Sequence, residues 1–252
     1  LEWGGALSAL CRVMGVMLRG ELPPAVAASL SRSRLVALLK GETEEEGVRP
    51  IAMGEVLHRV TSRWLSHAHQ REMRSALDVA NAFNSVERVV IFEQLRSRGF
   101  RRFIPFLRQF YTEPSDLQYF GVECPAILQS ARGVRQGDPL GPFLFSIAFQ
   151  PVLEAGMEVV RASGGVVAAY LDDSPVVAPP AVLGQAFAVM RDAADEIGVH
   201  FQLRKSTLFR LPEGMDVPEE LQGVQQTQEG VEVLRCPIGT PEYVAEWCRQ
   251  WV

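Results

Sequence analysis

Short apolar segments with strand character alternate along this chain with longer segments of helical periodicity, and this alternation constrains the fold most strongly. Pro23-Pro24 interrupts the first helical pattern. Helical spacing of apolar residues predicts helices at 1–19, 54–70, 87–98, 101–112, 139–160 and 180–197. Strand patterns fall at 35–39, 49–53, 75–79, 116–121, 125–131, 166–171, 176–178, 199–203, 206–210 and 231–235.

Two pairs of these strands are predicted to form antiparallel hairpins. The acidic loop 41–47 joins the first pair, and Asp172-Asp173 lies at the tip of the second. Because helices and hairpins are interspersed, the sequence predicts an α+β fold.

The composition indicates a chain that can bury a large core. Of the 252 residues, 47% are hydrophobic and 22% are charged, which excludes a disordered or fibrous chain. No apolar stretch is expected to approach the ~20 residues of a membrane helix, so no membrane partner is predicted. The N-terminus has neither a basic n-region nor an initiating Met, so we expect no signal peptide, and a fragment or processed product.

The cysteines and histidines show no spacing typical of a metal site. We expect the cysteines to be reduced and mostly buried thiols, in an intracellular protein of the nucleus or cytoplasm, with an organelle left open. The histidines are expected to be structural. These residues are Cys11, Cys124, Cys236, Cys248, His58, His67, His69 and His200.

Charge is distributed unevenly along the chain. The net charge of −5 on its face disfavours a nucleic-acid partner. Acids concentrate in the segments 41–47 and 211–234, however, so the remainder is net basic. A group of arginines with no acid between them fits either a contact with a phosphate backbone or an exposed helix–turn face: Arg96, Arg98, Arg101, Arg102 and Arg108.

Three carboxylates stand out because they end apolar strands. Asp78 follows one strand, and Asp172 and Asp173 lie between two others. Taken singly, each is explained as a cap or a turn residue. Together they could meet at one sheet edge, where a divalent cation would relieve their repulsion. Oxygen ligands suit Mg²⁺, and two such ions about 3.5–4 Å apart support in-line displacement, so the pattern indicates nucleotidyl or phosphoryl transfer.

A Gly- and Pro-rich segment at 133–142 lies between these acids in the sequence. Its glycines allow the backbone to approach a ligand closely. Asp138 is predicted to be a helix N-cap and Pro139 the first helical residue. A plain loop that begins a helix explains the segment equally well.

Taken in their order along the chain, the motifs of this sequence resemble those of reverse transcriptases, most closely those of non-LTR retrotransposons. The resemblance is carried by Leu-Asp-Val-Ala-Asn-Ala-Phe-Asn-Ser at 77–85, Arg-Gln-Gly-Asp-Pro-Leu-Gly-Pro at 135–142 and Tyr-Leu-Asp-Asp at 170–173. Segment 47–51 resembles the fingers strand of the family, and Lys205-Ser206 and 233–239 resemble later palm motifs. The resemblance extends over about 30–240.

The resemblance implies a two-metal site. Asp78 and Asp172 would be the metal ligands, with Asp173 beside them and the Val79 carbonyl as a further ligand. The ions would be two Mg²⁺, with Mn²⁺ as a substitute.

The resemblance also implies substrate contacts. Phe83 would exclude a ribose 2′-hydroxyl, although an ordinary core phenylalanine is the alternative. Arg49 would contact the triphosphate, because a guanidinium fork suits phosphate oxygens. Lys205 would neutralise or protonate the pyrophosphate leaving group. The incoming nucleotide and the template would contact Gln136, Gly137 and Tyr170.

The implied architecture is a right-hand polymerase with an antiparallel palm sheet packed on helices. We expect N-terminal helices and fingers at 1–73, a palm at 74–240 with a fingers-type insertion at about 87–135, and a C-terminal helix or the start of a missing thumb at 241–252. The thumb is expected to be absent because few residues follow Gly239. The implied activity is that of an RNA-directed DNA polymerase, which adds deoxynucleotides from deoxynucleoside triphosphates to a DNA primer 3′-end on an RNA template.

A non-enzymatic role is the alternative. A catalytically inactive domain of this type could act as a structural or nucleic-acid-binding subunit of a larger assembly or polyprotein. The acidic patches, the missing thumb and Pro175 favour it, because a proline beside the carboxylates cannot donate a ladder hydrogen bond.

Overall fold

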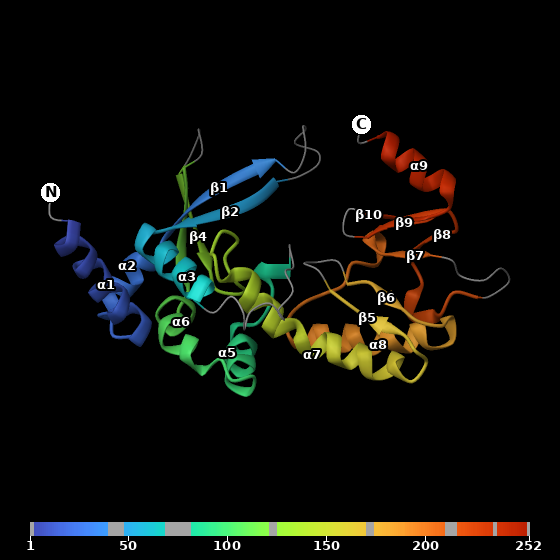
Figure 1. Ribbon diagram of the computed structural model, residues 1–252, viewed down its shortest axis with the longest axis horizontal. Helices are drawn as coiled ribbons and strands as arrows, with labels where there is room; N and C mark the ends of the chain where they lie inside the picture. Colours follow the sequence, from blue (N-terminus) through green and yellow to red (C-terminus); the bar gives the residue numbers. More distant parts are fainter. Residues whose placement is uncertain are drawn as a thin grey trace. The chain divides into compact units, whose positions relative to one another are not determined.

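The computed structural model describes residues 3–39, 48–68, 82–120, 125–169, 174–209, 216–233 and 236–250. The chain divides into two compact units, Leu1–Ala148 and Phe149–Val252 (Figure 1). Each unit combines helices and strands, which confirms the predicted mixed fold class.

A four-stranded sheet organises unit 1. Its strands are β1 (Ser33–Leu39), β2 (Val48–Gly54), β3 (Ser115–Phe120) and β4 (Pro125–Ser130), in the order β2-β1-β3-β4. β1 pairs antiparallel with β2, from Ser33 opposite Gly54 to Leu39 opposite Val48. The predicted hairpin is therefore confirmed, while the loop itself lies outside the described residues. β1 and β3 are parallel, and β3 and β4 are antiparallel.

Helices lie on one side of this sheet, some against strands and others against neighbouring helices (Figure 1). They are α1 (Trp3–Arg19), α2 (Pro24–Ser31), α3 (Val56–Ala68), α5 (Arg88–Ser97) and α6 (Ile104–Tyr111), with the 3₁₀ turns η2 (Ala82–Asn84) and η3 (Arg101–Phe103). Side chains alternate between the faces of a strand. Accordingly Ala52, at 5% exposed, lies on the covered face, whereas its neighbour Met53, at 41%, lies on the open one. The core beneath the sheet is aromatic and includes the fully buried Phe103, Phe106, Phe110 and Phe145.

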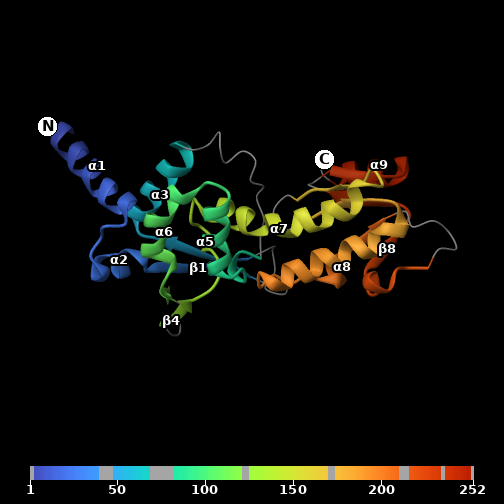
Figure 2. The same ribbon diagram turned by 90° about the horizontal axis from the view of Figure 1, so that it is seen from below.

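α7 (Gly141–Arg161) begins in unit 1 and continues into unit 2. In unit 2 it runs beside α8 (Pro180–Glu196), as Figure 2 shows. Gly156 permits this contact, because a Cβ there would lie 2.5 Å from the sulfur of Met190.

The strands of unit 2 form separate pairs. β5 (Val166–Val167) and β6 (Val176–Val177) are antiparallel, as are β9 (Gly230–Val233) and β10 (Cys236–Gly239). β7 (Thr207–Phe209) and β8 (Gln225–Thr227) are parallel. The remaining elements are η4 (Leu203–Lys205), η5 (Glu219–Leu221) and α9 (Pro241–Arg249). A single antiparallel palm sheet stays a prediction, because the described strands of this unit form two-stranded sheets.

All six predicted helices are present, but one predicted strand is wrong. The segment 199–203 pairs with no strand in the described part of the chain. Its alternating pattern arises because Val199 is buried and Phe201 packs against Phe149 and Phe187, with ring centroids 6.3 and 5.7 Å apart. The predicted strand 75–79 lies outside the described residues.

Two expectations drawn from composition are also wrong. α7, with 21 residues and a mean hydropathy of 1.4, is long and apolar enough to span a membrane, so a stretch of that length does exist. Of an 18-residue apolar stretch of this helix, 56% is buried within the protein, and a buried core helix can have the same length and hydropathy. Cys11, Cys236 and Cys248 are free thiols, as expected, but they are exposed rather than buried. Cys124 lies outside the described residues.

Candidate active site

The segment from Gly133 to Gly141 forms a tight loop between β4 and α7. The backbone N–H groups of Gly133 and Val134 donate to the carbonyl oxygens of Val86 and Phe83, at 2.8 and 2.6 Å. On the other side, the Ala52 N–H of β2 donates to the Gln136 carbonyl at 2.8 Å. The loop is therefore held between the segment that follows η2 and strand β2.

Two glycines permit these close approaches. Gly133 has a φ of +62°, and a Cβ there would overlap the Phe83 carbonyl oxygen. Gly137 has a φ of +105°, and its Cβ would lie 2.5 Å from the Ala52 carbonyl oxygen. Both conformations strongly favour glycine. These glycines were predicted to let the backbone approach a ligand, and in the structure they let the loop backbone approach the backbone of Phe83 and Ala52.

The structure brings several predicted site residues together. Gln136 and Gly137 lie in this loop, which is hydrogen-bonded to Phe83 of η2 and to Ala52 of β2, and Arg49 lies three residues before Ala52 in β2, opposite Leu38. The buried Oε1 of Gln136 has no hydrogen-bond partner among the described residues. Gly137 is exposed. Exposed Gly137 and half-buried Gln136 are therefore the part of this group that is a candidate contact for a nucleotide or a base.

Phe83 is itself part of the core. It is 7% exposed, and its ring stacks on Phe145 with centroids 5.3 Å apart and planes inclined by 29°. A Cβ on Gly141 would lie 3.7 Å from the same ring. Its role against the 2′-hydroxyl stays a prediction.

The remaining predicted residues belong to other parts of the chain. Lys205 is exposed at the end of η4 in unit 2, and its N–H donates to the Gln202 carbonyl at 3.0 Å. The metal ligands and one substrate residue lie outside the described residues: Asp78, Val79, Tyr170, Asp172 and Asp173.

The described part of the hairpin that was predicted to carry Asp172 and Asp173 is confirmed. Val166 pairs with Val177 and Val167 with Val176. The Ala168 N–H donates to the Pro175 carbonyl at 3.0 Å. Pro175 thus continues the pairing as an acceptor, which requires no N–H, and its presence is compatible with a regular approach to the turn.

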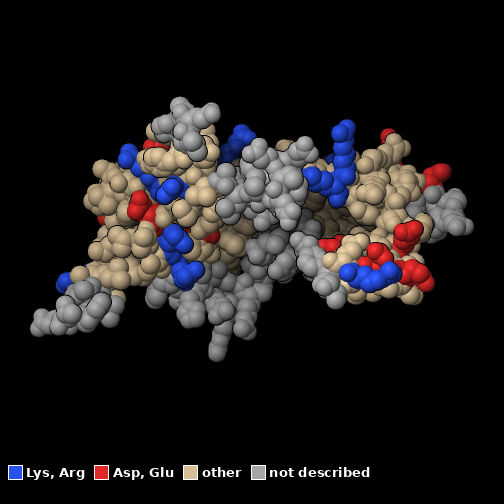
Figure 3. All heavy atoms as spheres, turned by 90° about the horizontal axis from the view of Figure 1, so that it is seen from above, with Lys and Arg blue, Asp and Glu red and all other residues tan. Residues whose placement is uncertain are grey.

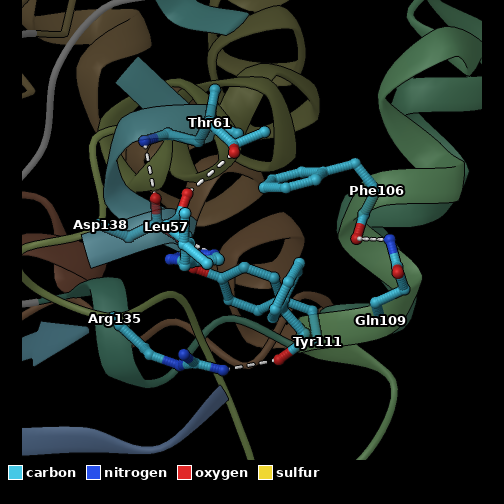
Figure 4. A network of polar contacts seen from close by, with 10 residues as sticks. Leu57, Thr61, Phe106, Gln109, Tyr111, Arg135 and Asp138 are labelled. Atoms are coloured by element: carbon cyan, nitrogen blue, oxygen red, sulfur yellow. Dashed lines mark hydrogen bonds and ion pairs between the residues drawn. The ribbon is translucent and has the colours of Figure 1, made fainter. Parts of the chain in front are cut away.

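Asp138 anchors the loop through its buried carboxylate. Its Oδ2 accepts a hydrogen bond of 2.5 Å from the Tyr111 hydroxyl, and its Oδ1 accepts one of 3.0 Å from the Leu140 N–H (Figure 4). α7 begins at Gly141, so the prediction that Pro139 is its first residue is wrong. Asp138 instead caps the turn that precedes the helix.

Two arginines flank the Tyr111 ring. The guanidinium carbons of Arg88 and Arg135 lie 5.2 and 5.3 Å from its centroid. Arg88 also donates to the carbonyl oxygens of Gly133 and Ser130, at 3.0 and 2.9 Å. Arg135 donates to the Phe110 carbonyl at 2.7 Å (Figure 4). Burial lowers the pKa of Arg88 to about 10, so the side chain stays charged at neutral pH.

His58 of α3 completes this cluster. Its Nε2 lies 3.8 Å from Asp138 Oδ2, and its ring packs on Phe106 and Phe110. Burial lowers the pKa of His58 despite the nearby Asp138 carboxylate. Burial, with the Asp138 charge as a further cause, raises the pKa of Tyr111 well above its ordinary value. Both side chains are therefore neutral at pH 7.

No sequence motif singles out Tyr111, Arg88 or His58 as site residues. Tyr111 and Arg88 lie in helices with ordinary periodicity, and His58 was expected to be structural. Only the three-dimensional contacts connect them to the loop. The arginine cluster lies on α5, η3 and α6, with Arg96, Arg101, Arg102 and Arg108 exposed, and its contact with phosphate stays a prediction.

No group of three or more potential metal ligands occurs in the described part of the chain. The acids predicted to be ligands lie outside that part. Their donor chemistry, carboxylate oxygens without His or Cys, is the kind that Mg²⁺ prefers.

The chain belongs to the reverse transcriptase (RNA-dependent DNA polymerase) family. The family model matches residues 7–238, which include the motifs at 47–51, 77–85, 135–142, 170–173 and 205–206 and all but the last residue of 233–239. The resemblance inferred from the sequence motifs is thereby confirmed.

Two curated relatives are retrotransposon proteins. The chain is 34% identical over 116 residues to a retrovirus-related Pol polyprotein from a type-2 retrotransposable element of Drosophila melanogaster, a match covering 43% of this chain and 11% of the relative. It is 36% identical over 83 residues to the 132 kDa protein of retrotransposable element SLACS from Trypanosoma brucei gambiense, covering 33% of this chain and 7% of the relative. The matches thus span a small part of much longer proteins.

Proposed function

We propose that this chain supplies the polymerase centre of an RNA-directed DNA polymerase. It adds deoxynucleotides, taken from deoxynucleoside triphosphates, to a DNA primer 3′-end on an RNA template. Membership of the reverse transcriptase family and the retrotransposon relatives support the proposal. The observation that carries it is the loop at 133–141. This loop contains Gln136 and Gly137, and it is hydrogen-bonded to Phe83 and to β2, the strand of Arg49.

In the proposed reaction, the primer 3′-oxygen attacks the α-phosphorus of the nucleotide. A new P–O bond forms as the bond to the β-phosphate bridging oxygen breaks, and pyrophosphate leaves. Asp78, Asp172, Asp173 and the Val79 carbonyl would hold two Mg²⁺ ions, whose positive charge stabilises both the attacking and the leaving oxygen.

The other predicted residues bind and orient the substrates. The Arg49 guanidinium binds triphosphate oxygens, and Lys205 neutralises or protonates the departing pyrophosphate. The Phe83 ring limits the space beside the sugar 2′-position. The base pair being formed lies against Gln136, Gly137 and Tyr170.

Primer extension tests this function. The purified 252-residue chain and its Asp172→Asn variant are each given an RNA template, a DNA primer, deoxynucleotides and Mg²⁺. Asp192→Asn is the matched control, because Asp192 is exposed on α8 and pairs with Arg191 at 3.2 Å. We expect Asp172→Asn to lower the rate at least ~100-fold, since loss of a metal ligand costs several kcal/mol.

Two results would contradict the proposal. The first is extension that continues in excess chelator. The second is equal extension by Asp172→Asn and Asp192→Asn. RNA binding without any extension would instead support a nucleic-acid-binding subunit.

A further inference from the structure

Tyr111, the last residue of α6, lies at the centre of the contacts that hold the loop from Gly133 to Gly141. It is 2% exposed. Its hydroxyl donates to Asp138, and its ring lies beside the guanidinium groups of Arg88 and Arg135. One side chain of α6 thereby contacts two residues of the loop, Arg135 and Asp138.

The two arginines donate hydrogen bonds to backbone carbonyls. Arg88 donates to Gly133 and Ser130 carbonyls at the start of the loop. Arg135, within the loop, donates to the carbonyl of Phe110, the residue before Tyr111. The Tyr111 ring therefore lies beside two arginines whose own hydrogen bonds reach the start of the loop and the end of α6.

The hydroxyl of Tyr111 has a specific electrostatic task. The Asp138 side chain is 2% exposed, and a buried carboxylate is costly unless hydrogen bonds satisfy it. Within the described ranges, it accepts hydrogen bonds from the Tyr111 hydroxyl and the Leu140 N–H, while His58 lies at 3.8 Å. Loss of the hydroxyl would leave Oδ2 without its hydrogen bond.

A shift of Asp138 would be transmitted to the residues that face the nucleotide. Asp138 directly follows Gly137 in the chain, and Gln136 is tied to β2 through its carbonyl. Because the segment between these two anchors is so short, movement at Asp138 changes the placement of Gln136 and Gly137. Misplacement of binding groups by about 1 Å is enough to lower activity strongly.

We propose that Tyr111 is a positioning residue, which sets the affinity for the incoming nucleotide through Asp138 without touching the nucleotide. The inference rests on the proposed function of the loop. A positioning role differs from a purely structural role, because loss of the Tyr111 hydroxyl would then change the nucleotide affinity of a protein that is still folded.

The test is Tyr111→Phe, which removes the hydroxyl and keeps the ring beside the arginines. Tyr119→Phe is the matched control, since Tyr119 is 37% exposed on β3 of the same unit. Primer extension gives kcat and KM for the deoxynucleotide. Hydrogen–deuterium exchange measures the protection of the amides at 133–141 and in the rest of unit 1.

We expect Tyr111→Phe to raise KM about tenfold, with kcat within about threefold of the parent, because one charge-assisted hydrogen bond is lost. Amide exchange should rise at 133–141 alone. Tyr119→Phe should match the parent in both measurements.

Three results would overturn the inference. One is an unchanged KM in folded Tyr111→Phe. Another is a fall in kcat with exchange raised throughout unit 1, which indicates a structural role only. The third is a parent chain that fails to extend primers, which contradicts the proposed function as well and is recognised by the inactivity of the parent itself.

Discussion

Among single residues, His58 shows most clearly how burial sets the chemistry of unit 1. The side chain is 2% exposed, and its Nε2 has no hydrogen-bond partner among the described residues. Desolvation outweighs the attraction of Asp138, so the pKa of His58 is lowered. The folded state therefore keeps the imidazole neutral at pH values where an unfolded chain would protonate it.

This neutrality makes stability depend on pH. Below the ordinary histidine pKa of about 6.5, the unfolded state binds a proton at His58 that the folded state does not bind. The free energy of unfolding consequently falls as the pH drops from about 6.5 towards the lowered pKa. Urea unfolding at pH 7.5 and 5.5 should show this fall, and His58→Gln should lose part of it.

His200→Gln is the control for this experiment, because His200 is exposed and contacts Asp195 at 2.6 Å. A pH dependence in His58→Gln identical to that of the parent would show that His58 is protonated in the folded state.

Gly133 is the residue at which substitution should disturb the site most directly. A Cβ there would meet the Phe83 carbonyl and adopt a φ of +62°, whereas Gly99, with a φ of +85°, has open space around it. Gly99→Ala should cost about 1 kcal/mol through backbone strain alone. Gly133→Ala should cost about 1–3 kcal/mol more through overlap. Equal midpoints in urea unfolding would contradict the close approach of the loop to Phe83.

The part of the site that the sequence could predict consists of residues inside continuous motifs. Phe83, Gln136 and Gly137 were selected because their segments have recognisable composition and order. Tyr111 could not be selected, since an aromatic residue at helical spacing usually indicates core packing. Its hydroxyl became significant only when folding placed it 2.5 Å from Asp138.

At the scale of whole elements, a proline marks the start of a helix that the apolar pattern did not predict. Pro23-Pro24 was interpreted only as the end of the first helix, yet Pro24 begins α2. Pro179-Pro180 begins α8 in the same way, and there the helix was predicted because its apolar periodicity is long. Proline at the first helical position has no N–H to leave unpaired. α2, with only eight residues, is too short for periodicity to reveal it.

α7 is the element whose packing contributes most clearly to the core. Leu144 is 0% exposed within it, whereas Leu128 of β4 is 51% exposed. Leu144→Ala should lower the free energy of unfolding by about 3 kcal/mol, because a buried leucine leaves a cavity. Leu128→Ala should lower it by less than about 1 kcal/mol. Equal losses in urea titration would contradict the placement of α7 in the core.

At the level of the whole molecule, net charge is a poor guide to the partner. The value of −5 argued against nucleic acid, but three of the acids are the proposed metal ligands. On the face shown in Figure 3, the described basic and acidic side chains are interspersed. A nucleic-acid partner is therefore better inferred from the motifs and the family than from the total charge.

In the proposed mechanism, acids that lie far apart in the sequence form one metal site. The direct test is Mn²⁺ binding in the presence of a deoxynucleotide and primer–template, measured by electron paramagnetic resonance. The parent chain and Asp192→Asn should each bind two ions that Mg²⁺ displaces. Asp78→Asn and Asp172→Asn should each lose at least one ion. Unchanged binding in either variant would contradict a shared two-metal centre.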